Sequence, residues 1–517
     1  MKRPNIILIM ADQLTVSALA NYGNTIVNAP HINSLSEKGV TFDNAYCNFP
    51  ICAPSRYSML TGRLPHSIQA YDNASELTAD QPTLMHYLRK LGYSTTLSGK
   101  MHFVGPDQLH GYSERLNTDI YPADFAWVPN WKEGPRNAPT GISMRAVVEA
   151  GSCLRSLQLD YDEQTAFLTK QKIYDLARNS RGQPFFVTVS FSHPHSPYTA
   201  YQDHWDRYRH EDIDMPQVPP IPLESLDTHS KWLYYSHGRD RISVTEEHVR
   251  NARHAYYGMV SYVDDKVGEI IALLKHTELL EDSIIIFTSD HGEMLGERGM
   301  WFKQTFFESA SRVPLIISGP GIAGARRVQS NVSLVDLMPT ILALANDGEA
   351  THTTPIDGCN LTELFDEKEV DNNRVVLSEY SDMGVCAPCR MIRQGKYKYV
   401  YVHGHESLLF NLENDPLELH DLSSDTTHQE IKAKLHSAVL TNWDPEGLNQ
   451  LILDSQARRE VIWSVVKGSS HRENWSYVVS KGDEQKYVRG GGDNEGTIAV
   501  KGRARFPYVE PAKLKSF

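Results

Sequence analysis

Residues 5–13 read NIILIMADQ, a short apolar run that ends in the polar residues Asp12 and Gln13. A run this short and rich in Ile is typical of a strand buried on both faces of a sheet. Lys2 and Arg3 precede it, as in a secretory signal, but the apolar run is too short and no small-residue cleavage site follows. The sequence therefore predicts a buried N-terminal strand in a cytoplasmic protein.

Similar runs recur along the chain and alternate with helix-length amphipathic stretches. Further strands are predicted at 93–98, 184–191, 283–288 and 313–318, and helices at 83–91, 164–178, 245–275 and 333–345. This alternation predicts an α/β fold with a large mixed, mostly parallel sheet sandwiched by helices. Asp264 and Asp265, on the long helix at 245–275, are expected on its solvated face rather than at a metal.

The character of the sequence changes twice towards the C-terminus. Short strand candidates lie at 375–379, 391–394 and 398–402, which indicates a smaller antiparallel sheet packed with a helix. Later the chain becomes rich in Gly, Arg and aromatic residues, including Trp463, Trp475, Tyr477, Tyr487, Phe506 and Tyr508. So many aromatic residues are not expected to stay in solvent. We predict a large α/β domain at 1–360, an α+β subdomain at 361–445 and an extended C-terminal tail at 446–517.

The composition excludes several classes of protein. The 517 residues include 51 Lys and Arg against 64 Asp and Glu, which gives a net charge of −13 and argues against binding nucleic acid through a broad basic face. No apolar run approaches the length of a membrane-spanning helix, so no membrane partner is expected. Six cysteines in a chain of this length do not form a disulfide framework.

Polar residues follow four of the predicted strands, at the edge where ligands of such sheets bind. They are Asp12 and Gln13, Lys100 and His102, His193 and His195, and Asp290 and His291. Their shared position predicts one site. Asp12, Asp290 and His291 supply oxygen and nitrogen ligands for a divalent cation; carboxylates favour Ca²⁺, Mg²⁺ or Mn²⁺, and the imidazole also allows Zn²⁺.

Residues 52–62 read CAPSRYSMLTG and predict a short helix. Pro54 suits its first turn, and Gly62 can end it. Cys52 then lies at the helix N-terminus, which favours an anion, and Arg56 lies one turn later and can reach back. From these residues alone, a thiolate nucleophile or a buried cysteine is equally open.

The pattern Cys52-x-Pro-Ser-Arg56-x-x-x-Leu-Thr-Gly62 resembles the signature of type I sulfatases, in the alkaline-phosphatase-like superfamily. The resemblance extends from residue 4 to about 425 and includes PNIILIMADQ at 4–13, GKMHF at 99–103, the SF-x-x-PH pattern ending at His195, TSDHGEMLGERG at 288–299 and LFNLENDPLE at 409–418. It implies that a formylglycine-generating maturation enzyme oxidises Cys52 to Cα-formylglycine. It also implies one bound divalent metal, with Ca²⁺ expected and Mg²⁺ or Mn²⁺ as alternatives.

The resemblance also implies a mechanism. One hydroxyl of the hydrated aldehyde attacks sulfur and releases the alcohol by S–O cleavage; the other is then deprotonated, and sulfate is expelled. In this scheme His102 is the base for expulsion, His195 protonates the leaving group, Arg56 holds the hydrate oxygen, and Lys100 and Lys303 bind sulfate oxygens. The metal ligands implied are Asp12, Gln13, residue 52, Asp290 and His291.

Two departures from the commonest sulfatase pattern narrow the resemblance. Gln13 stands where many sulfatases have a second aspartate, and His291 where many have asparagine. Such variants resemble the branch of choline sulfatases and phosphonate monoester hydrolases, and they make Gln13 a neutral ligand. The choline-sulfatase side of this branch is favoured by GKMHF and by the tail segments at 473–479, 485–490 and 503–509. The resemblance to choline sulfatases covers essentially the whole chain.

Choline O-sulfate, the substrate thus implied, needs a site for a quaternary ammonium group. Aromatic faces and a carboxylate would hold it, each cation–π contact contributing about 0.5–2 kcal/mol. The candidates are Trp127 and Glu379, with Asn73 bonding the ester or sulfate oxygen. Two other roles are equally open: Trp127 could serve core or interface packing, and Glu379 could form a surface or structural salt bridge. A homo-oligomer, dimer or tetramer, is expected through the tail, whose aromatic residues could complete the cage across subunits.

Two other functions remain open at this point. The same site could hydrolyse a phosphonate or phosphate monoester, or an aryl sulfate. If the chain is not an enzyme, the alternative is a catalytically inactive protein that binds quaternary ammonium compounds. The intact set of Cys52, Arg56, His102, His195 and Lys303 argues against that alternative.

Overall fold

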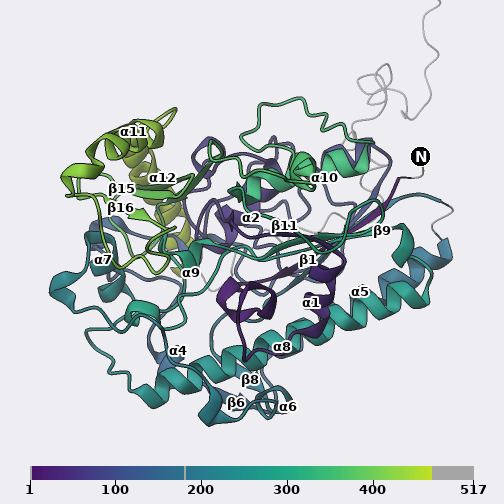
Figure 1. Ribbon diagram of the computed structural model, residues 1–517, viewed down its shortest axis with the longest axis horizontal. Coiled ribbons are helices and arrows are strands. Elements are labelled where there is room, and N and C mark those ends of the chain that lie inside the picture. The colour runs from purple at the N-terminus through teal and green to yellow at the C-terminus, as the bar shows by residue number, and fades with distance from the viewer. Residues whose placement is uncertain (1–2, 180–181, 469–517) are drawn as a thin grey trace, which may run out of the picture. The chain divides into compact units, whose positions relative to one another are not determined.

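The structure, a computed structural model, describes residues 3–179 and 182–468, which form one compact unit (Figure 1). The three tail segments at 473–479, 485–490 and 503–509, and every aromatic residue predicted to pack there except Trp463, lie outside the described residues.

The large sheet has eight strands in the order β11-β2-β10-β9-β1-β7-β4-β5. Their bounds are β1 (Asn5–Ala11), β2 (Gly39–Phe42), β4 (Ser94–Gly99), β5 (Glu114–Arg115), β7 (Phe185–Phe191), β9 (Ser283–Thr288), β10 (Leu315–Ser318) and β11 (Arg326–Val328). The pairs β9–β1, β1–β7 and β7–β4 are parallel, and only β10 runs antiparallel to its neighbours in this sheet. The prediction of a large mixed, mostly parallel sheet is confirmed.

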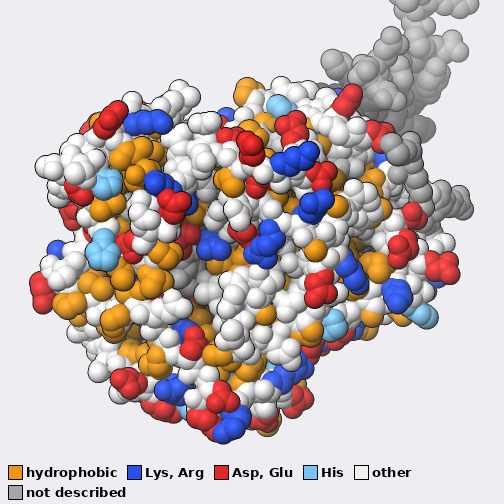
Figure 2. Space-filling view, in the orientation of Figure 1, with side chains coloured by type: hydrophobic (Ala, Val, Ile, Leu, Met, Phe, Trp, Pro, Cys, Tyr) orange, Lys and Arg blue, Asp and Glu red, His pale blue; other side chains and the backbone are white. Residues whose placement is uncertain are grey.

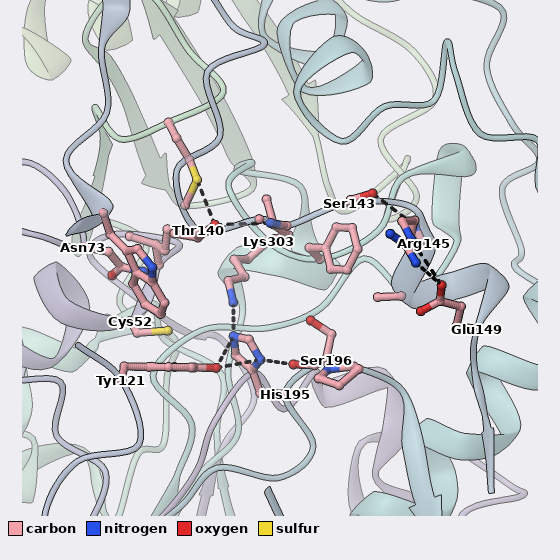
Figure 3. A pocket seen from close by; sticks show the side chains of 18 residues that line it. Cys52, Asn73, Tyr121, Thr140, Ser143, Arg145, Glu149, His195, Ser196 and Lys303 are labelled. Carbon is pink, nitrogen blue, oxygen red and sulfur yellow. Dashed lines mark hydrogen bonds and ion pairs between the residues drawn. The ribbon is translucent and has the colours of Figure 1, made fainter. Parts of the chain in front are cut away.

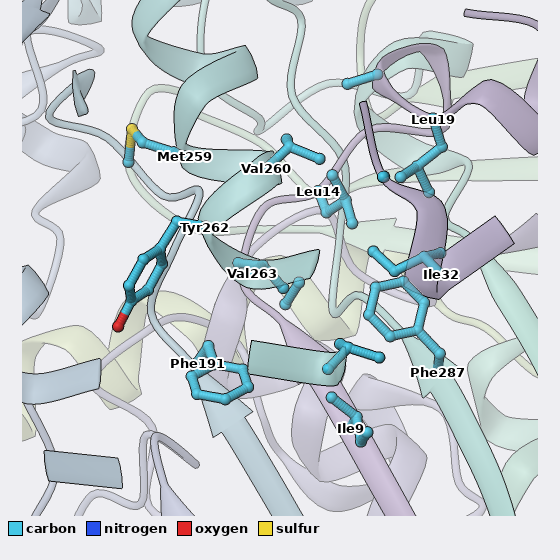
Figure 4. Packing of buried hydrophobic residues seen from close by; sticks show 14 of the residues in the cluster. Ile9, Leu14, Leu19, Ile32, Phe191, Met259, Val260, Tyr262, Val263 and Phe287 are labelled. Carbon is cyan, nitrogen blue, oxygen red and sulfur yellow. The ribbon is translucent and has the colours of Figure 1, made fainter. Parts of the chain in front are cut away.

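Helices cover both faces of this sheet, which explains why its strands are continuously apolar. Ile7 and Ile9 of β1 pack in the cluster that contains residues of α8 (Glu246–His276), α5 (Leu157–Asn179) and α1 (Pro30–Glu37). Ile6 and Leu8, which point the other way, pack with α2 (Cys52–Thr61), α3 (Leu84–Lys90) and α10 (Leu337–Ala345). Figure 1 shows α8 and α10 on opposite sides of the sheet, and Figure 4 shows Val260 and Val263 of α8 near the strands.

Several short helices and strands accompany the large sheet. The helices are α4 (Arg145–Val148), α6 (Gln202–Trp205), α7 (Thr228–Ser236) and α9 (Glu308–Ser311), and the strands form the pairs β12 (Val332–Ser333) with β3 (Ala45–Tyr46) and β6 (Gly151–Cys153) with β8 (Thr199–Tyr201).

The predicted solvated position of Asp264 is wrong. Asp264 lies on α8 and is fully buried, and its carboxylate accepts backbone N–H bonds from His31 and Ile32. These two residues belong to the first turn of α1, whose N–H groups have no partner inside their own helix. Asp264 therefore caps a neighbouring helix, whereas Asp265 is partly exposed and pairs with Arg207.

A second, antiparallel sheet follows the large one in the chain. It contains β13 (Val375–Tyr380), β14 (Cys389–Gln394), β15 (Tyr397–Val402) and β16 (Leu408–Asn411) in sequence order. Leu435 and Val439 of α11 (Gln429–Val439) pack against one face of it. The predicted small antiparallel sheet packed with a helix is confirmed.

The first part of the predicted tail is a helix. α12 (Pro445–Gly468) buries three side chains, Ile452, Gln456 and Arg459, against the rest of the unit. Trp463 lies on this helix and is half-buried. Among the described residues, no helix has both the length and the apolar character that crossing a bilayer requires. On the face shown in Figure 2, acidic and basic side chains are interspersed.

Candidate active site

The carboxyl ends of the four central strands bring the predicted residues together. Asp12, Cys52, Asp290 and His291 are all buried, and one potential ligand atom from each lies within 4.8 Å of the others. Asp12 follows β1, Asp290 and His291 follow β9, and Cys52 begins α2. Two carboxylates and an imidazole at this spacing fit a divalent cation.

Cys52 is enclosed by charged and polar groups. Its Sγ lies 3.3 Å from His291 Nε2 and 3.3 Å from Lys100 Nζ. Burial and, next, the Asp12 carboxylate raise the pKa of the Cys52 thiol to about 11, against the effect of Lys100. A thiol with this pKa is protonated at neutral pH, so the geometry argues against a thiolate nucleophile.

Cations hold the two aspartates in their ionised form. Burial alone would raise the pKa of Asp12, but Lys100, which contacts its carboxylate, and Arg56 lower it below the usual range. Asp290 Oδ2 accepts from Arg56 Nε at 2.8 Å, and this guanidinium likewise outweighs burial and lowers the pKa of Asp290. Both carboxylates are therefore ready to bind a cation.

Arg56, on α2, bonds groups from three neighbouring segments. Its Nη1 donates to the Lys100 carbonyl at 2.6 Å and to Ser190 Oγ at 2.9 Å. Within the described residues its Nη2 has no hydrogen-bond partner and lies 3.8 Å from Asp12 Oδ2. Arg56 therefore bonds one carboxylate, one carbonyl and one hydroxyl, and its Nη2 group is left to bind an oxygen near Asp12.

A buried glutamate that the sequence reasoning missed orients Gln13. Gln13 Nε2 donates to Glu293, and Gln13 Oε1 accepts from Lys303 Nζ. Glu293 also accepts N–H bonds from Leu295 at 2.8 Å and Phe302 at 2.6 Å, so its position is fixed. Glu293 therefore turns the Gln13 carbonyl oxygen towards Lys303. The only signal in the sequence was its place in the loop after Asp290 and His291.

His195 and Lys303 meet at the entrance to the site. His195 Nε2 lies 2.6 Å from Lys303 Nζ, and Nδ1 lies 3.1 Å from the Tyr121 hydroxyl. Burial and the Lys303 ammonium lower the pKa of His195 well below its ordinary value. His193, from the same loop, instead contacts buried Asp162 at 2.6 Å and supports the fold.

His102 is buried with both ring nitrogens unpaired among the described residues. Its ring lies against Tyr121 and Trp127, with centroid distances of 5.2 and 5.5 Å. Burial and the Lys100 charge lower its pKa to about 3. Buried polar atoms almost always have partners, so an unpaired imidazole beside Lys100 indicates a position for a further polar group.

Backbone strain is concentrated around these side chains. Gln13, His102, Phe302 and Gln304 all adopt positive φ angles, between 62° and 77°. Such strain persists where the surrounding structure holds it, often at functional sites. Gly99, which precedes Lys100, has a φ of 94°, and a Cβ there would lie 2.0 Å from the Ser190 carbonyl oxygen. Glycine is therefore required where the chain turns towards the site.

A cavity of about 450 Å³ opens beside Cys52 (Figure 3). The predicted residues that line it are Cys52, Asn73, Trp127, His195 and Lys303. Its outer wall includes Thr140, Arg145 and Glu149, which the sequence reasoning did not select. Figure 3 shows Lys303 pointing at His195 near Cys52, and Arg145 paired with Glu149 at the other side.

Glu379 does not line this cavity. Its Oε1 lies 2.6 Å from His66 Nδ1 and 3.3 Å from Arg390 Nε, and Oε2 accepts the His66 backbone N–H. The structure thus places Glu379 in an ion pair beside the smaller sheet, and the cavity receives no carboxylate from it.

Comparisons with known proteins agree with this site. Residues 4–347 match the sulfatase family, and residues 296–444 match the C-terminal part of N-sulphoglucosamine sulphohydrolase. The chain is 41% identical over 494 residues to the choline-sulfatase of Rhizobium meliloti (strain 1021), covering 94% of this chain and 96% of that one. It is 28% identical to arylsulfatase K of Homo sapiens, over 85% of this chain and 82% of that one.

The fold is also that of a solved hydrolase. The phosphonate monoester hydrolase of Agrobacterium radiobacter superimposes with a TM-score of 0.68 at 23% identity, covering 87% of this chain and 96% of that one. The family model matches residues 4–347, and the relative at 41% identity is matched along nearly its full length. The chain therefore belongs to the sulfatase family and is a sulfuric ester hydrolase.

Proposed function

We propose that this chain hydrolyses choline O-sulfate to choline and sulfate, with a formylglycine at position 52 as the nucleophile. The observation that carries the proposal is the position of Cys52, at the start of α2 and within 3.3 Å of both His291 and Lys100. The thiol pKa of about 11 makes the unmodified residue a poor nucleophile. The identity to a choline-sulfatase supports the choice of substrate.

The donor set that would hold the metal is Asp12, Gln13, Asp290 and His291, together with residue 52. Ca²⁺ is the expected ion, with Mg²⁺ and Mn²⁺ as alternatives, because most of the donors are oxygen atoms. When bound, a divalent cation supplies positive charge that stabilises the ionised form of a hydroxyl and the charge on a sulfate oxygen.

The chain's own cations would hold the sulfate. Lys100 and Lys303 both lie beside the cluster, and Lys100 Nζ is 3.3 Å from Cys52 Sγ. Arg56 Nη2 has no hydrogen-bond partner among the described residues, so it can donate to a sulfate oxygen. Positive charge fixed in a buried site stabilises negative charge as it moves to the leaving oxygen.

Two imidazoles would handle the protons. His195 lies at the cavity wall in contact with Lys303 Nζ, so this pair can deliver a proton to the departing alkoxide. His102 is buried and its ring nitrogens are unpaired among the described residues, so it can accept the proton of the second hydroxyl on residue 52. Each transfer resets the site for the next turnover.

The choline group would lie against Trp127, which lines the cavity. Tyr121 lies beside it, with ring centroids 4.8 Å apart, and the Lys100 ammonium already lies over the Tyr121 ring, 4.1 Å from its centroid. Asn73 lines the same cavity and would bond an ester or sulfate oxygen.

We also propose a cytoplasmic homo-oligomer, a dimer or tetramer formed through the C-terminal region. α12 exposes four apolar side chains that would be covered in such an assembly: Leu451, Val461, Ile462 and Val465. Light scattering should give a multiple of the chain mass, and Val461→Glu with Val465→Glu should lower it. A monomeric native chain would contradict this part of the proposal.

The test is sulfate release by the chain produced with a formylglycine-generating enzyme, together with the mass of the peptide that contains residue 52. We expect conversion of Cys52 and turnover of choline O-sulfate, and Cys52→Ala should abolish turnover while the fold stays intact. Turnover by Cys52→Ala at the native rate would sink the mechanism. Faster hydrolysis of a phosphonate monoester or an aryl sulfate would favour those substrates. Tight choline binding without sulfate release would favour a binding protein.

A further inference from the structure

An ion pair ties the C-terminal helix to the loop that carries Asn73. Arg459, on α12, bonds Asp72 with both ends of its guanidinium, each N···O distance being 2.6 Å. Asp72 is fully buried and Arg459 is only 7% exposed. A planar two-point contact of this kind fixes direction as well as distance. The position of α12 therefore determines where this loop lies.

The loop in turn fixes Asn73 from three sides. Asp72 precedes Asn73, and its Oδ1 also accepts the N–H of Ala74 at 2.9 Å, which closes a tight turn. The backbone N–H of Asn73 donates to Asp382 at 2.9 Å. The side-chain Oδ1 of Asn73 accepts the N–H of Ala53 at 2.9 Å. Asn73 is thus held through its neighbour, its backbone and its side chain.

The last of these bonds reaches the nucleophile position. Ala53 follows Cys52 in the first turn of α2, where N–H groups lack partners within the helix. The residue before α2, Ile51, provides no side-chain cap, so Asn73 supplies an acceptor from another part of the chain. Oδ1 faces Ala53, and the Nδ2 donor of Asn73 remains to bond an oxygen of a ligand in the cavity.

The same helix also contacts the segment that carries Trp127. Gln456, one turn before Arg459, accepts the N–H of Trp131 at 3.1 Å. Trp131 Nε1 donates to the Asp382 carbonyl at 3.1 Å, which joins this contact to the Asn73 loop. The short turn at Phe125–Trp127 also packs against α12. One helix therefore contacts the supports of both Asn73 and Trp127.

Charge explains why arginine is needed here. Asp382 is buried near Asp72, and burial together with that neighbour raises the pKa of Asp382 well above its ordinary value. Arg459 provides the positive charge that Asp72 requires in this dry setting, and without it a buried carboxylate would lack a partner. Lysine would restore the charge but not the two-point contact.

We propose that Arg459 is a positioning residue for the active site: through Asp72 it sets the place of Asn73 and of the first turn of α2, and thereby controls substrate binding. The inference rests on the proposed function only for the role of Asn73 at the substrate. In this proposal α12, at the start of the C-terminal region, helps to position the active-site residues.

The test compares Arg459→Met and Arg459→Lys with Arg458→Met, which alters the exposed neighbour on the same helix. The substrate is whichever of choline O-sulfate, an aryl sulfate and a phosphonate monoester the native chain hydrolyses fastest, so failure of the choline assignment does not affect the outcome. Rates are expressed per formylglycine-containing molecule. We expect Arg459→Met to raise KM about tenfold or more, Arg459→Lys to lie between, and Arg458→Met to stay within about twofold of the native value.

To distinguish positioning of Asn73 from a purely structural role, Arg459→Met is also made in the Asn73→Ala variant. If Arg459 acts through Asn73, Arg459→Met adds little to the KM of that variant. An unchanged KM in both Arg459 variants would overturn the proposal, and so would an equal additional loss in the Asn73→Ala background. If Arg459→Met does not fold, Arg459→Lys and Asp72→Asn decide the matter by the same criteria.

Discussion

Lys303 Nζ lies 2.6 Å from His195 Nε2, so a cation and an imidazole share a proton position at the wall of the cavity. Burial and the Lys303 charge lower the pKa of His195 well below its ordinary value, so the ring is neutral near pH 7. In the proposed mechanism this contact would join sulfate binding to protonation of the leaving group, and the choice of leaving group tests that role.

His195→Ala should affect a poor leaving group more than a good one. An alkoxide such as that of choline needs a proton as it departs, whereas an activated phenolate does not. We expect kcat/KM to fall about 10²–10⁴-fold with choline O-sulfate and much less with 4-nitrophenyl sulfate. Steady-state kinetics with both esters measures the difference, and the exposed His276→Ala is the control. Equal losses with both esters would exclude this role.

Glu293→Gln should weaken metal binding through Gln13. An amide at position 293 that keeps its two backbone N–H bonds presents a donor to Gln13 Nε2, so the Gln13 amide has to turn its oxygen away. We expect divalent-cation affinity to fall about 10–100-fold, the usual effect of losing a support for a ligand. Calorimetric titration of the chelator-treated protein measures it directly.

Tyr198→Phe provides the matched control for that variant. It removes the hydroxyl that donates to Glu293 at 2.9 Å but leaves the Gln13 contact in place. Its metal affinity should remain close to native. If both variants bind the metal as tightly as the native chain, Glu293 does not orient Gln13.

Acid should destabilise the protein through its buried neutral histidines. Burial lowers the pKa of His237, which bonds Gln304 at 2.6 Å, to about 4. The unfolded chain takes up a proton near pH 6.5 and the native chain does not, so this stability is complete above pH 6.5 and is lost as the pH falls towards 4. Each such group contributes up to about 1.4 kcal/mol per pH unit in that range.

His237→Gln should therefore flatten the dependence of stability on pH. Urea unfolding at pH 6 and pH 5 should show about 1 kcal/mol less loss in this variant than in the native chain. The same substitution at exposed His276 serves for comparison. An unaltered slope in His237→Gln would mean that the buried ring is not the source of the acid sensitivity.

Asp264→Ala should destabilise the fold much more than Asp265→Ala. Asp264 caps the first turn of α1 through two backbone N–H bonds, and their loss in a buried position should cost about 1–3 kcal/mol. The Asp265 carboxylate is 35% exposed and pairs with Arg207, so its removal should cost less than about 1 kcal/mol. Equilibrium unfolding of both variants gives the comparison, and equal losses would contradict the capping role.

The sequence predicts the large sheet and most of the site because both depend on local patterns. Short apolar runs fix the strands, and parallel topology then requires that the residues after them meet, as Asp12, Lys100 and Asp290 do. Glu293 was missed because its role depends on a bond to Gln13, which is distant in the chain. No local pattern states which carboxylate will meet which amide.

The errors have the same origin. Asp264 has the neighbours of a surface residue in the sequence, yet α1 starts directly against it. Glu379 lies near the end of a predicted strand, but that strand, β13, belongs to the smaller sheet, where Arg390 pairs with it. α12 was assigned to an aromatic-rich tail because its composition was averaged with that of later residues. Long-range partners decided the positions of Asp264 and Glu379.

The burial of α2 has a consequence for the timing of biosynthesis. All ten residues of this helix are buried, and α10 with the turn at Leu334–Asp336 packs against it. These covering residues follow Cys52 far along the chain, so they leave the ribosome much later. If residue 52 is converted to formylglycine as proposed, the maturation enzyme has to act before they close over it. The rate at which the second half of the chain is made and folds would then set how long Cys52 can be converted, and slower translation should raise the converted fraction.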